Sequence, residues 1–132
     1  MNAVLPERRI EVTPTFVVST ALATRDFQDV HHDRDAALAR GSKDVFVNIL
    51  TTTGLVQSYI SEWAAAWAGP LARVTAVEIR LGVPCYAYET LVLGGEVLDT
   101  VGGVVRVKVV GRVSLGDHVT GTVSVVVPQG AA

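Results

Sequence analysis

The chain has 132 residues and a formal net charge of -2 at pH 7, a length that suits one domain. Its basic residues are scattered, with Arg8 and Arg9 as the one adjacent pair. This argues against binding of nucleic acid, which needs clustered Lys and Arg. The single cysteine excludes an intrachain disulfide. The lack of a signal-peptide pattern and of a long apolar run predicts a cytoplasmic protein with no membrane span.

The first part of the chain is predicted to form a strand, a polar loop and a short helix. Residues 15–19 are rich in β-branched and aromatic side chains, which favours a strand. Residues 24–33 are polar and have no clear period, as is typical of a loop. Residues 33–40 are predicted to be helical, because Asp33 can cap the N-terminus and Gly41 can end the helix.

Residues 46–67 carry the strongest helical pattern in the chain. Their apolar side chains recur mostly every three or four residues, as on one face of a helix. Asp44 stands just before this segment, where a capping residue is favoured. Gly69-Pro70 follows it, where a helix commonly ends. The opposite face carries mainly Thr and Ser, so we expect a central helix that is covered on most of its surface.

The rest of the chain follows a strand pattern. Four segments are rich in Val and are punctuated by glycines that indicate turns or bulges; the strands are 73–81, 90–98, 104–113 and 118–127, and the glycine pairs and turns are at 94–95, 102–103 and 116–117. An antiparallel sheet wrapped around the long helix satisfies this order of elements. We therefore predict an α+β fold formed by a single domain over residues 1–132.

The loop before the short helix concentrates ionisable residues. Residues 25–33 hold three carboxylates and two imidazoles. One interpretation is a solvated, charge-rich loop, which is common on protein surfaces. A second is a metal site, although the segment matches no known spacing of metal ligands. In the third, Asp26 and His31 converge on one water molecule for general acid–base catalysis, because a carboxylate accepts a proton and an imidazole titrates near neutral pH.

The segment from Asp26 to His31 resembles the D-x-N-P-x-H motif of the MaoC-like, or (R)-specific, enoyl-CoA hydratases. Segments 31–41, 47–50 and 81–91 follow in the order and spacing of that family, so the resemblance covers nearly the whole chain. It implies a hot-dog fold, in which an antiparallel sheet wraps around one central helix. It also implies enoyl-CoA hydratase activity, with Asp26 and His31 as the catalytic acid–base pair. No metal and no cofactor are expected, since CoA is part of the substrate.

The same resemblance implies substrate-binding residues on the central helix. The backbone N–H of Ile49, where the family usually has Gly, would stabilise the thioester oxygen as an oxyanion hole. Asn48 stands beside it at the start of the helix. Gln57 falls where some members have a serine that orients the catalytic Asp. The chain departs from the motif at residues 28–29, where Gln and Asp replace Asn and Pro and remove the stiffness of a proline.

A narrower resemblance links the chain to the small MaoC-like subunits of actinobacterial steroid side-chain hydratases. It rests on residues 19–33, 41–44, 54–57 and 81–84. It implies a steroid substrate, a cholesterol side-chain enoyl-CoA, and a second, larger MaoC-like subunit as partner in an α2β2 heterotetramer. A hot-dog domain also exposes a sheet edge and a helix face, which pairing with another domain would bury.

Two other functions stay open from the residues alone. One is a hot-dog acyl-CoA thioesterase, a class that usually draws an acidic residue from the central helix, where residues 46–61 have none. The other is a non-catalytic subunit that only supports a partner. Release of free thiol from acyl-CoA would identify the thioesterase, and indifference to substitution of Asp26 and His31 would identify the supporting subunit.

Three further residues that can carry chemistry are interpreted as structural. His32 should point away from His31 if the loop is extended, which favours a structural or solvated side chain. His118 follows Gly116-Asp117 in a predicted turn and is given no role in the site. Cys85 is predicted to be a small buried hydrophobe, because no basic neighbour in the sequence would lower the pKa of its thiol.

Overall fold

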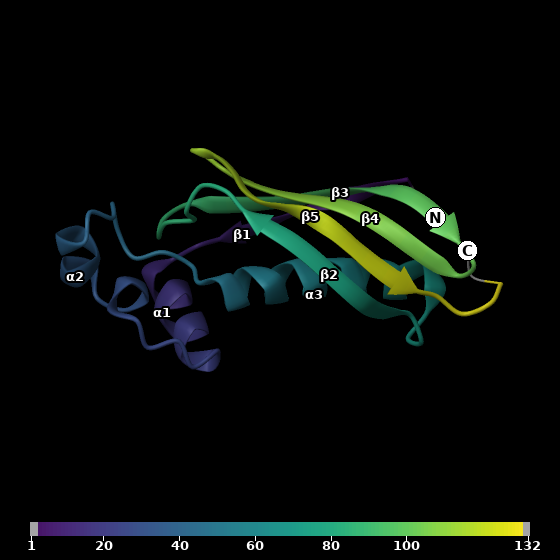
Figure 1. Ribbon diagram of the computed structural model, residues 1–132, viewed down its shortest axis with the longest axis horizontal. Coiled ribbons are helices and arrows are strands. Elements are labelled where there is room, and N and C mark those ends of the chain that lie inside the picture. Colours follow the sequence, from purple (N-terminus) through teal and green to yellow (C-terminus); the bar gives the residue numbers. More distant parts are fainter. Residues whose placement is uncertain (1–2, 131–132) are drawn as a thin grey trace.

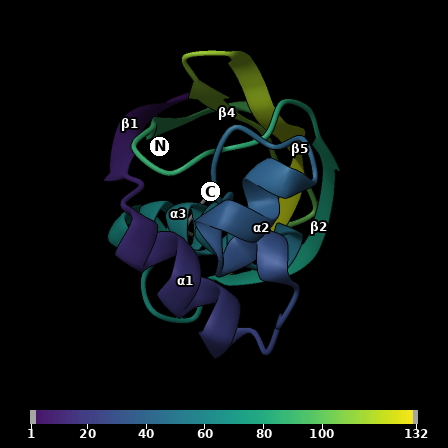
Figure 2. The same cartoon turned by 90° about the vertical axis from the view of Figure 1, so that its left-hand side faces the viewer.

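The computed structural model describes residues 3–130 and shows a five-stranded antiparallel sheet curved along one long helix (Figure 1). In chain order the elements are β1 Val4–Glu11, α1 Pro14–Ala23, the 3₁₀ turn η1 Asp29–His31, α2 Arg34–Ala39, α3 Ile49–Ala68, β2 Arg73–Leu81, β3 Thr90–Val101, β4 Val104–Val113 and β5 Gly116–Val126. The strands lie in the order β1-β3-β4-β5-β2, so β1 and β2 form the two edges. The short helices α1 and α2 gather at the end of the molecule where α3 begins (Figure 2).

The core lies between the concave face of the sheet and one face of α3. Because side chains alternate across a strand, every second residue of the central strands is buried, as in β4. Most of the largest fully buried side chains come from the sheet and from α3, among them Leu91, Leu93, Val105, Val107, Val109, Val123, Val125, Val56 and Ile60. Each contributes about 1.5–3 kcal/mol of hydrophobic free energy, and together they hold α3 against the sheet.

α3 begins at Ile49, with Asn48 rather than Asp44 as its N-cap. The side chain of Asn48 caps the helix by accepting a hydrogen bond from the N–H of Thr51 at 3.1 Å. Asp44 instead accepts a hydrogen bond from the N–H of its neighbour Val45. The helix ends where we predicted, at Gly69, whose φ of 86° lies in the left-handed region that glycine tolerates. The predicted helix is therefore confirmed, but the predicted cap was wrong.

The prediction of a strand at residues 15–19 was also wrong, because these residues belong to α1. Thr13 caps this helix by accepting a hydrogen bond from the N–H of Phe16 at 3.0 Å. Pro14 occupies the first helical position, where a backbone N–H would have no acceptor within the helix, so the N–H that proline lacks costs no hydrogen bond. Val17 and Ala21, one turn apart, form the buried face. Capping and burial thus outweigh the local preference of β-branched residues for strands.

The other predicted elements are present, with shifted ends for two strands. Segments 73–81 and 104–113 match β2 and β4, whereas β3 ends later than predicted and β5 both begins and ends earlier. The predicted short helix is α2, with Asp33 accepting a hydrogen bond from the N–H of Ala36. Residues 94–95 lie inside β3 and form no turn. Within residues 3–130, no helix is long and apolar enough to cross a membrane.

Candidate active site

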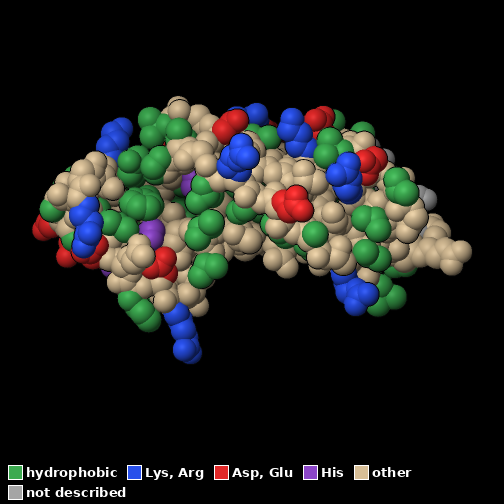
Figure 3. Space-filling model, viewed as in Figure 1, with side chains coloured by type: hydrophobic (Ala, Val, Ile, Leu, Met, Phe, Trp, Pro, Cys, Tyr) green, Lys and Arg blue, Asp and Glu red, His purple; other side chains and the backbone are tan. Residues whose placement is uncertain are grey.

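A pocket of about 340 Å³ opens where the loop between α1 and α2 meets the start of α3. Its walls come from this loop, from the start of α3, from the turn after β2 and from β5: Asp26, Gln28, His31, Phe46, Val47, Asn48, Ile49, Leu81, Gly82, Val83, Pro84 and His118. At this end of the molecule, histidine and acidic side chains lie among apolar ones on the surface (Figure 3). The structure thus brings together most of the site residues that we predicted.

The turn that ends α1 aims Asp26 toward the pocket. Arg25 has a φ of 57°, in the left-handed region. The N–H of Arg25 donates to the carbonyl of Leu22 at 3.0 Å, and the N–H of Asp26 donates to the carbonyl of Ala21 at 2.9 Å. This is the Schellman closure, which usually places glycine where Arg25 stands. The two hydrogen bonds hold a strained residue in place and so define where the chain leaves the helix.

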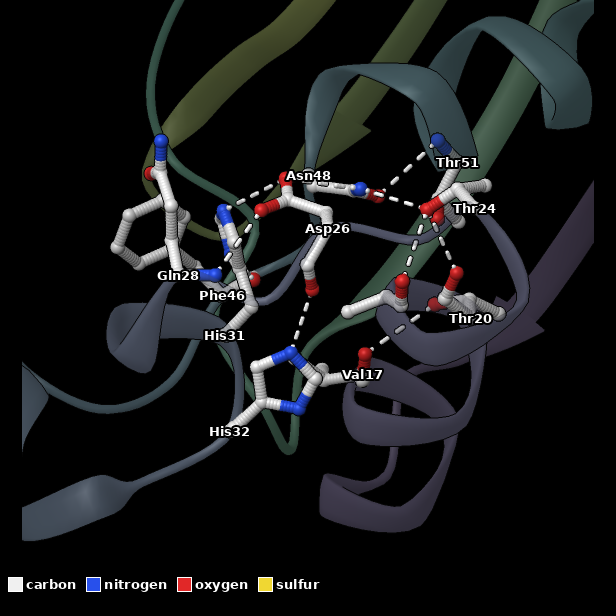
Figure 4. Close-up of polar contacts among 11 residues, drawn as sticks. Val17, Thr20, Thr24, Asp26, Gln28, His31, His32, Phe46, Asn48 and Thr51 are labelled. Carbon is white, nitrogen blue, oxygen red and sulfur yellow. Dashed lines mark hydrogen bonds and ion pairs between the residues drawn. The ribbon is translucent and has the colours of Figure 1, made fainter.

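The side chains of Asp26 and His31 both line the pocket and point toward each other (Figure 4). Nε2 of His31 lies 3.4 Å from Oδ2 of Asp26, and Nδ1 of His31 lies 2.7 Å from the carbonyl oxygen of Phe46. Because a carbonyl can only accept, Nδ1 carries the hydrogen, and in the neutral ring Nε2 is then an acceptor. The site therefore presents two proton acceptors, a carboxylate oxygen and an imidazole nitrogen, to the same point of the pocket.

Neighbouring groups hold the Asp26 carboxylate and favour its charged form. Oδ1 accepts a hydrogen bond from the N–H of Gln28 at 3.2 Å, and Oδ2 accepts one from Nδ2 of Asn48 at 3.1 Å. Burial opposes ionisation of Asp26, but these hydrogen bonds and the nearby His31 and His32 outweigh it, so the pKa of Asp26 lies below its ordinary value. The carboxylate is therefore ionised at neutral pH.

Asn48, which was predicted to bind substrate, lines the pocket, but its side-chain amide is held by contacts within the protein. Its side chain is buried, with 3% of the residue exposed. Nδ2 donates to Oγ1 of Thr24 at 2.8 Å and to Asp26, while Oδ1 accepts from the N–H of Thr51 (Figure 4). Both hydrogens of the amide and one lone pair of Oδ1 thus have partners within the protein, which gives Asn48 a structural function at this site.

Gln57 does not lie where the resemblance implied. It is an exposed residue of α3 and does not line the pocket. It stands more than two turns beyond Ile49, which is about 12 Å along the axis at the usual rise per residue. The side-chain amide that reaches Asp26 is instead that of Asn48.

The N–H of Ile49 stays a candidate for the oxyanion hole. Ile49 is the first residue of α3 and lines the pocket. The first N–H groups of a helix have no carbonyl one turn earlier to bond with, and they lie at the positive end of the helix dipole. The N–H groups of Thr51 and Thr52 are bonded to the side chain and the carbonyl of Asn48. This leaves the N–H groups of Ile49 and Leu50, and of these two residues only Ile49 lines the pocket, so its N–H stays the predicted donor.

His118 is a pocket residue that sequence reasoning missed. It is buried on β5, with 2% of the residue exposed. Its Nδ1 donates to the carbonyl of Val83 at 2.7 Å, and its Nε2 lies 2.8 Å from Oγ1 of Thr52, whose hydroxyl is the donor. His118 thereby fastens the turn after β2 to the first turn of α3. A single histidine beside a glycine turn carries no sequence signal of such burial.

The remaining candidates have structural contacts. Nε2 of His32 donates to the backbone carbonyl of Asp26 at 2.5 Å, which gives His32 a structural role. Cys85 is fully buried, as predicted, and burial raises the pKa of its thiol to about 12. In the part of the chain that the structure describes, no group of three or more His, Cys, Asp or Glu side chains is arranged to hold a metal ion.

A curated relative with a stated activity matches almost the whole chain. The 3-oxo-4,17-pregnadiene-20-carboxyl-CoA hydratase beta subunit of Mycobacterium tuberculosis is 62% identical over 123 residues, which cover 93% of this chain and 92% of the relative. The chain belongs to the MaoC-like enoyl-CoA hydratase family. No protein-family model matches it.

Solved structures confirm the hot-dog fold of this family member. A chain in the crystal structure of the ChsH1–ChsH2 complex from Mycobacterium tuberculosis is 60% identical, with a TM-score of 0.90 over 96% of this chain and 97% of that one. The (R)-hydratase of A. caviae involved in PHA biosynthesis is 15% identical, with a TM-score of 0.83 over 93% of each chain. At that level of identity the second likeness concerns the fold alone.

Proposed function

We propose that this chain is the catalytic subunit of an enoyl-CoA hydratase that adds water across the α,β double bond of a steroid side-chain CoA thioester. One observation carries the catalytic assignment: Oδ2 of Asp26 and Nε2 of His31 face each other at 3.4 Å on the wall of a pocket. The activity of the relative from Mycobacterium tuberculosis supports the steroid substrate.

The pair is arranged to bind and activate water. The gap of 3.4 Å between the two acceptor atoms is too narrow for a water on the line that joins them. A water within hydrogen-bond reach of both atoms would therefore lie to the side, in the pocket. It would donate one hydrogen to Asp26 and one to His31, and its lone pair would point at the bound substrate.

Hydration then needs one proton to move twice. An O–H bond of the water breaks as its oxygen bonds to the β carbon, and Asp26 or His31 takes the proton. The π electrons move toward the thioester oxygen, where the N–H of Ile49 at the positive end of α3 would stabilise the enolate. The same proton returns to the α carbon, so the product is the substrate plus one water, and no cofactor takes part.

The size and lining of the pocket support an apolar acyl group and a partner subunit. A volume of about 340 Å³ is at the small end of ligand sites, and a steroid CoA thioester would extend well beyond it. Leu81, Val83 and Pro84 line one wall, and the side chains of Ile49 and Leu50 stand exposed at the start of α3. We propose that a larger MaoC-like subunit completes the channel over these residues, in an α2β2 assembly.

The proposal is tested with the chain co-purified with its MaoC-like partner. Hydration of 3-oxo-4,17-pregnadiene-20-carboxyl-CoA is followed by the loss of enoyl absorbance and by the mass gain of one water. We expect Asp26→Asn and His31→Ala each to lower kcat by about 10²–10⁴-fold. Asp29→Asn is the matched control, because Asp29 pairs with Arg40 outside the pocket, and it should keep the activity.

Two results would contradict the proposal. Release of free CoA thiol without loss of the double bond would indicate a thioesterase. Full activity in both Asp26→Asn and His31→Ala would indicate a subunit that only supports the partner's chemistry.

A further inference from the structure

We propose that Asn48 and Thr24 are positioning residues, which hold the Asp26 carboxylate in the one orientation that turns Oδ2 toward Nε2 of His31. This inference rests on the proposed hydratase function, and it assigns a role to two residues that contact no reacting atom. The contacts that carry it join the C-terminal end of α1 to the first turn of α3 (Figure 4).

The orientation of the Asn48 amide follows from its role as helix cap. A backbone N–H can only donate, so the atom that faces the N–H of Thr51 at 3.1 Å must be the carbonyl oxygen Oδ1. Nδ2 is therefore the atom that faces Thr24 and Asp26, and its two hydrogens match these two contacts at 2.8 and 3.1 Å. A flipped amide would lose the cap and would place an oxygen against a carboxylate.

Thr24 must accept from Asn48, because its own hydrogen is already used. Oγ1 of Thr24 lies 2.9 Å from the carbonyl of Thr20 and 3.1 Å from that of Ala21. Carbonyls only accept, so the hydroxyl hydrogen points back into α1, and a lone pair of Oγ1 faces Nδ2 of Asn48. We call these contacts of Asn48 with Thr24 and Asp26 the relay. Each hydrogen bond in it has a defined direction, from Asn48 to Thr24 and to Asp26, and from Thr24 to the end of α1.

Asp26 needs this support because the backbone fixes only one of its oxygens. The N–H of Gln28 bonds to Oδ1, whereas the side-chain bond to Oδ2 comes from Asn48. The terminal torsion of an Asp side chain is soft, and 22% of the side chain is exposed. Without Nδ2 of Asn48, the carboxylate can turn away from His31 toward solvent.

The relay adds a hydrogen-bond donor to Asp26 without adding a charge. The titratable groups that act on Asp26 are His31 and His32, both from the segment around η1, while His118 lines the same pocket from β5. The residues that α1 and α3 contribute, Thr24 and Asn48, are uncharged. A change at Asn48 can therefore alter how readily Asp26 takes a proton without altering the charges around it.

Substitutions at Asn48 separate positioning from helix capping. Serine and aspartate both cap helices about as well as asparagine, but neither supplies the Nδ2 donor. In the complex with the partner subunit, we expect Asn48→Ser to lower kcat by about 10- to 100-fold, the scale of a misplaced catalytic group, with KM and Tm close to wild type. Asn48→Asp should lower kcat further and shift the acidic limb of the kcat profile to higher pH, because a second carboxylate replaces the donor.

Thr24 gives an independent test that leaves the cap of α3 intact. We expect Thr24→Val, which keeps the shape but loses the hydroxyl, to lower kcat with KM unchanged, and Thr24→Ser to restore most of the loss. Ser19→Ala is the matched control on α1, since its hydroxyl bonds back to Thr15 and lies outside the pocket. If Asn48→Ser fails to fold, the kcat values of Thr24→Val and Thr24→Ser test the proposal in its place.

The outcomes distinguish the relay from the function on which it rests. Wild-type kcat and an unshifted pH profile in both Asn48→Ser and Thr24→Val, beside an inactive Asp26→Asn, would overturn the relay alone. A raised KM with unchanged kcat in Asn48→Ser would also overturn it, because Asn48 would then be a substrate-binding residue. Full activity in Asp26→Asn would instead overturn the proposed catalytic function.

Discussion

At the scale of single residues, His118 links the pH dependence of folding to the pocket wall. Burial lowers its pKa, and the hydrogen bond to the carbonyl of Val83 offsets this only in part. The unfolded chain protonates such a histidine at about pH 6.5, whereas the folded chain does so only at lower pH. The stability contributed by the neutral ring is thus complete above about pH 6.5 and is lost as the pH falls through the folded pKa.

We therefore expect the free energy of unfolding of the wild-type chain to fall below about pH 6.5 and His118→Gln to make this fall shallower. Glutamine offers one donor for the carbonyl of Val83 and one acceptor for Thr52, but it does not titrate. Urea denaturation followed by circular dichroism at a series of pH values measures the slope. If the free energy of unfolding falls equally steeply with pH in both proteins, His118 does not cause this fall.

The approach of Asp26 to His31 could be predicted from sequence, whereas the contact between Asp26 and Asn48 could not. Asp26 and His31 stand on one short segment, so their spacing along the chain carries the information. The partner of Asp26 is Asn48, 22 residues away, and the contact depends on how the turn after α1 meets the first turn of α3. Gln57 was chosen by its place in a family pattern, and no local signal in the sequence marks Asn48 instead.

At the scale of elements, the errors fall where capping or edge position outweighs propensity. The pair Thr13-Pro14 is a helix start signal that the β-branched run at residues 15–19 concealed. β1 was not predicted, because its charges and Pro6 hide the alternation of a strand. Such residues are typical of sheet edges, where they discourage pairing with other chains. The helices and strands that build the core follow strong periodic patterns, and those predictions were confirmed.

The register between β2 and β5 depends on close backbone approach at Gly121. A Cβ atom there would lie 2.2 Å from the backbone oxygen of Glu78, so Gly121→Ala must push β2 away from β5. We expect a loss of about 1–3 kcal/mol in the free energy of unfolding, the range for overpacking. We also expect a lower kcat/KM, because β2 leads directly into the pocket wall at Leu81 and Gly82. Urea denaturation and the hydration assay measure the two effects.

Gly54 is the matched control for this substitution. It lies on the exposed side of α3, and a Cβ there would meet nothing within 4 Å. Gly54→Ala should raise the free energy of unfolding by about 0.5–1 kcal/mol, because alanine favours the helix. Equal changes in the free energy of unfolding in Gly54→Ala and Gly121→Ala would show that the close approach of the backbone at Gly121 does not matter for stability.

At the scale of the whole molecule, the two edges of the sheet differ in their capacity to pair. β1 contains Pro6, which lacks an N–H, and both edge strands have a register shift, between Leu5 and Arg8 in β1 and between Val74 and Ala76 in β2. β2 has nine residues and no proline, and its last residue, Leu81, lines the pocket. A partner that completes the pocket would therefore pair along β2 and leave β1 at the outer edge.

Hydrogen exchange of the backbone amides can test this pairing without any substitution. In the chain alone, the β2 amides that point away from β5 have no partner strand among residues 3–130, so they should exchange quickly. In the complex with the proposed MaoC-like partner, we expect them to slow by roughly 10-fold or more, as amides do when they enter a ladder, while β1 amides stay unchanged. Protection at β1 alone would place the partner on the opposite edge, far from Leu81. The pocket would then have to be closed by the exposed side chains of α3 rather than by a continuous sheet.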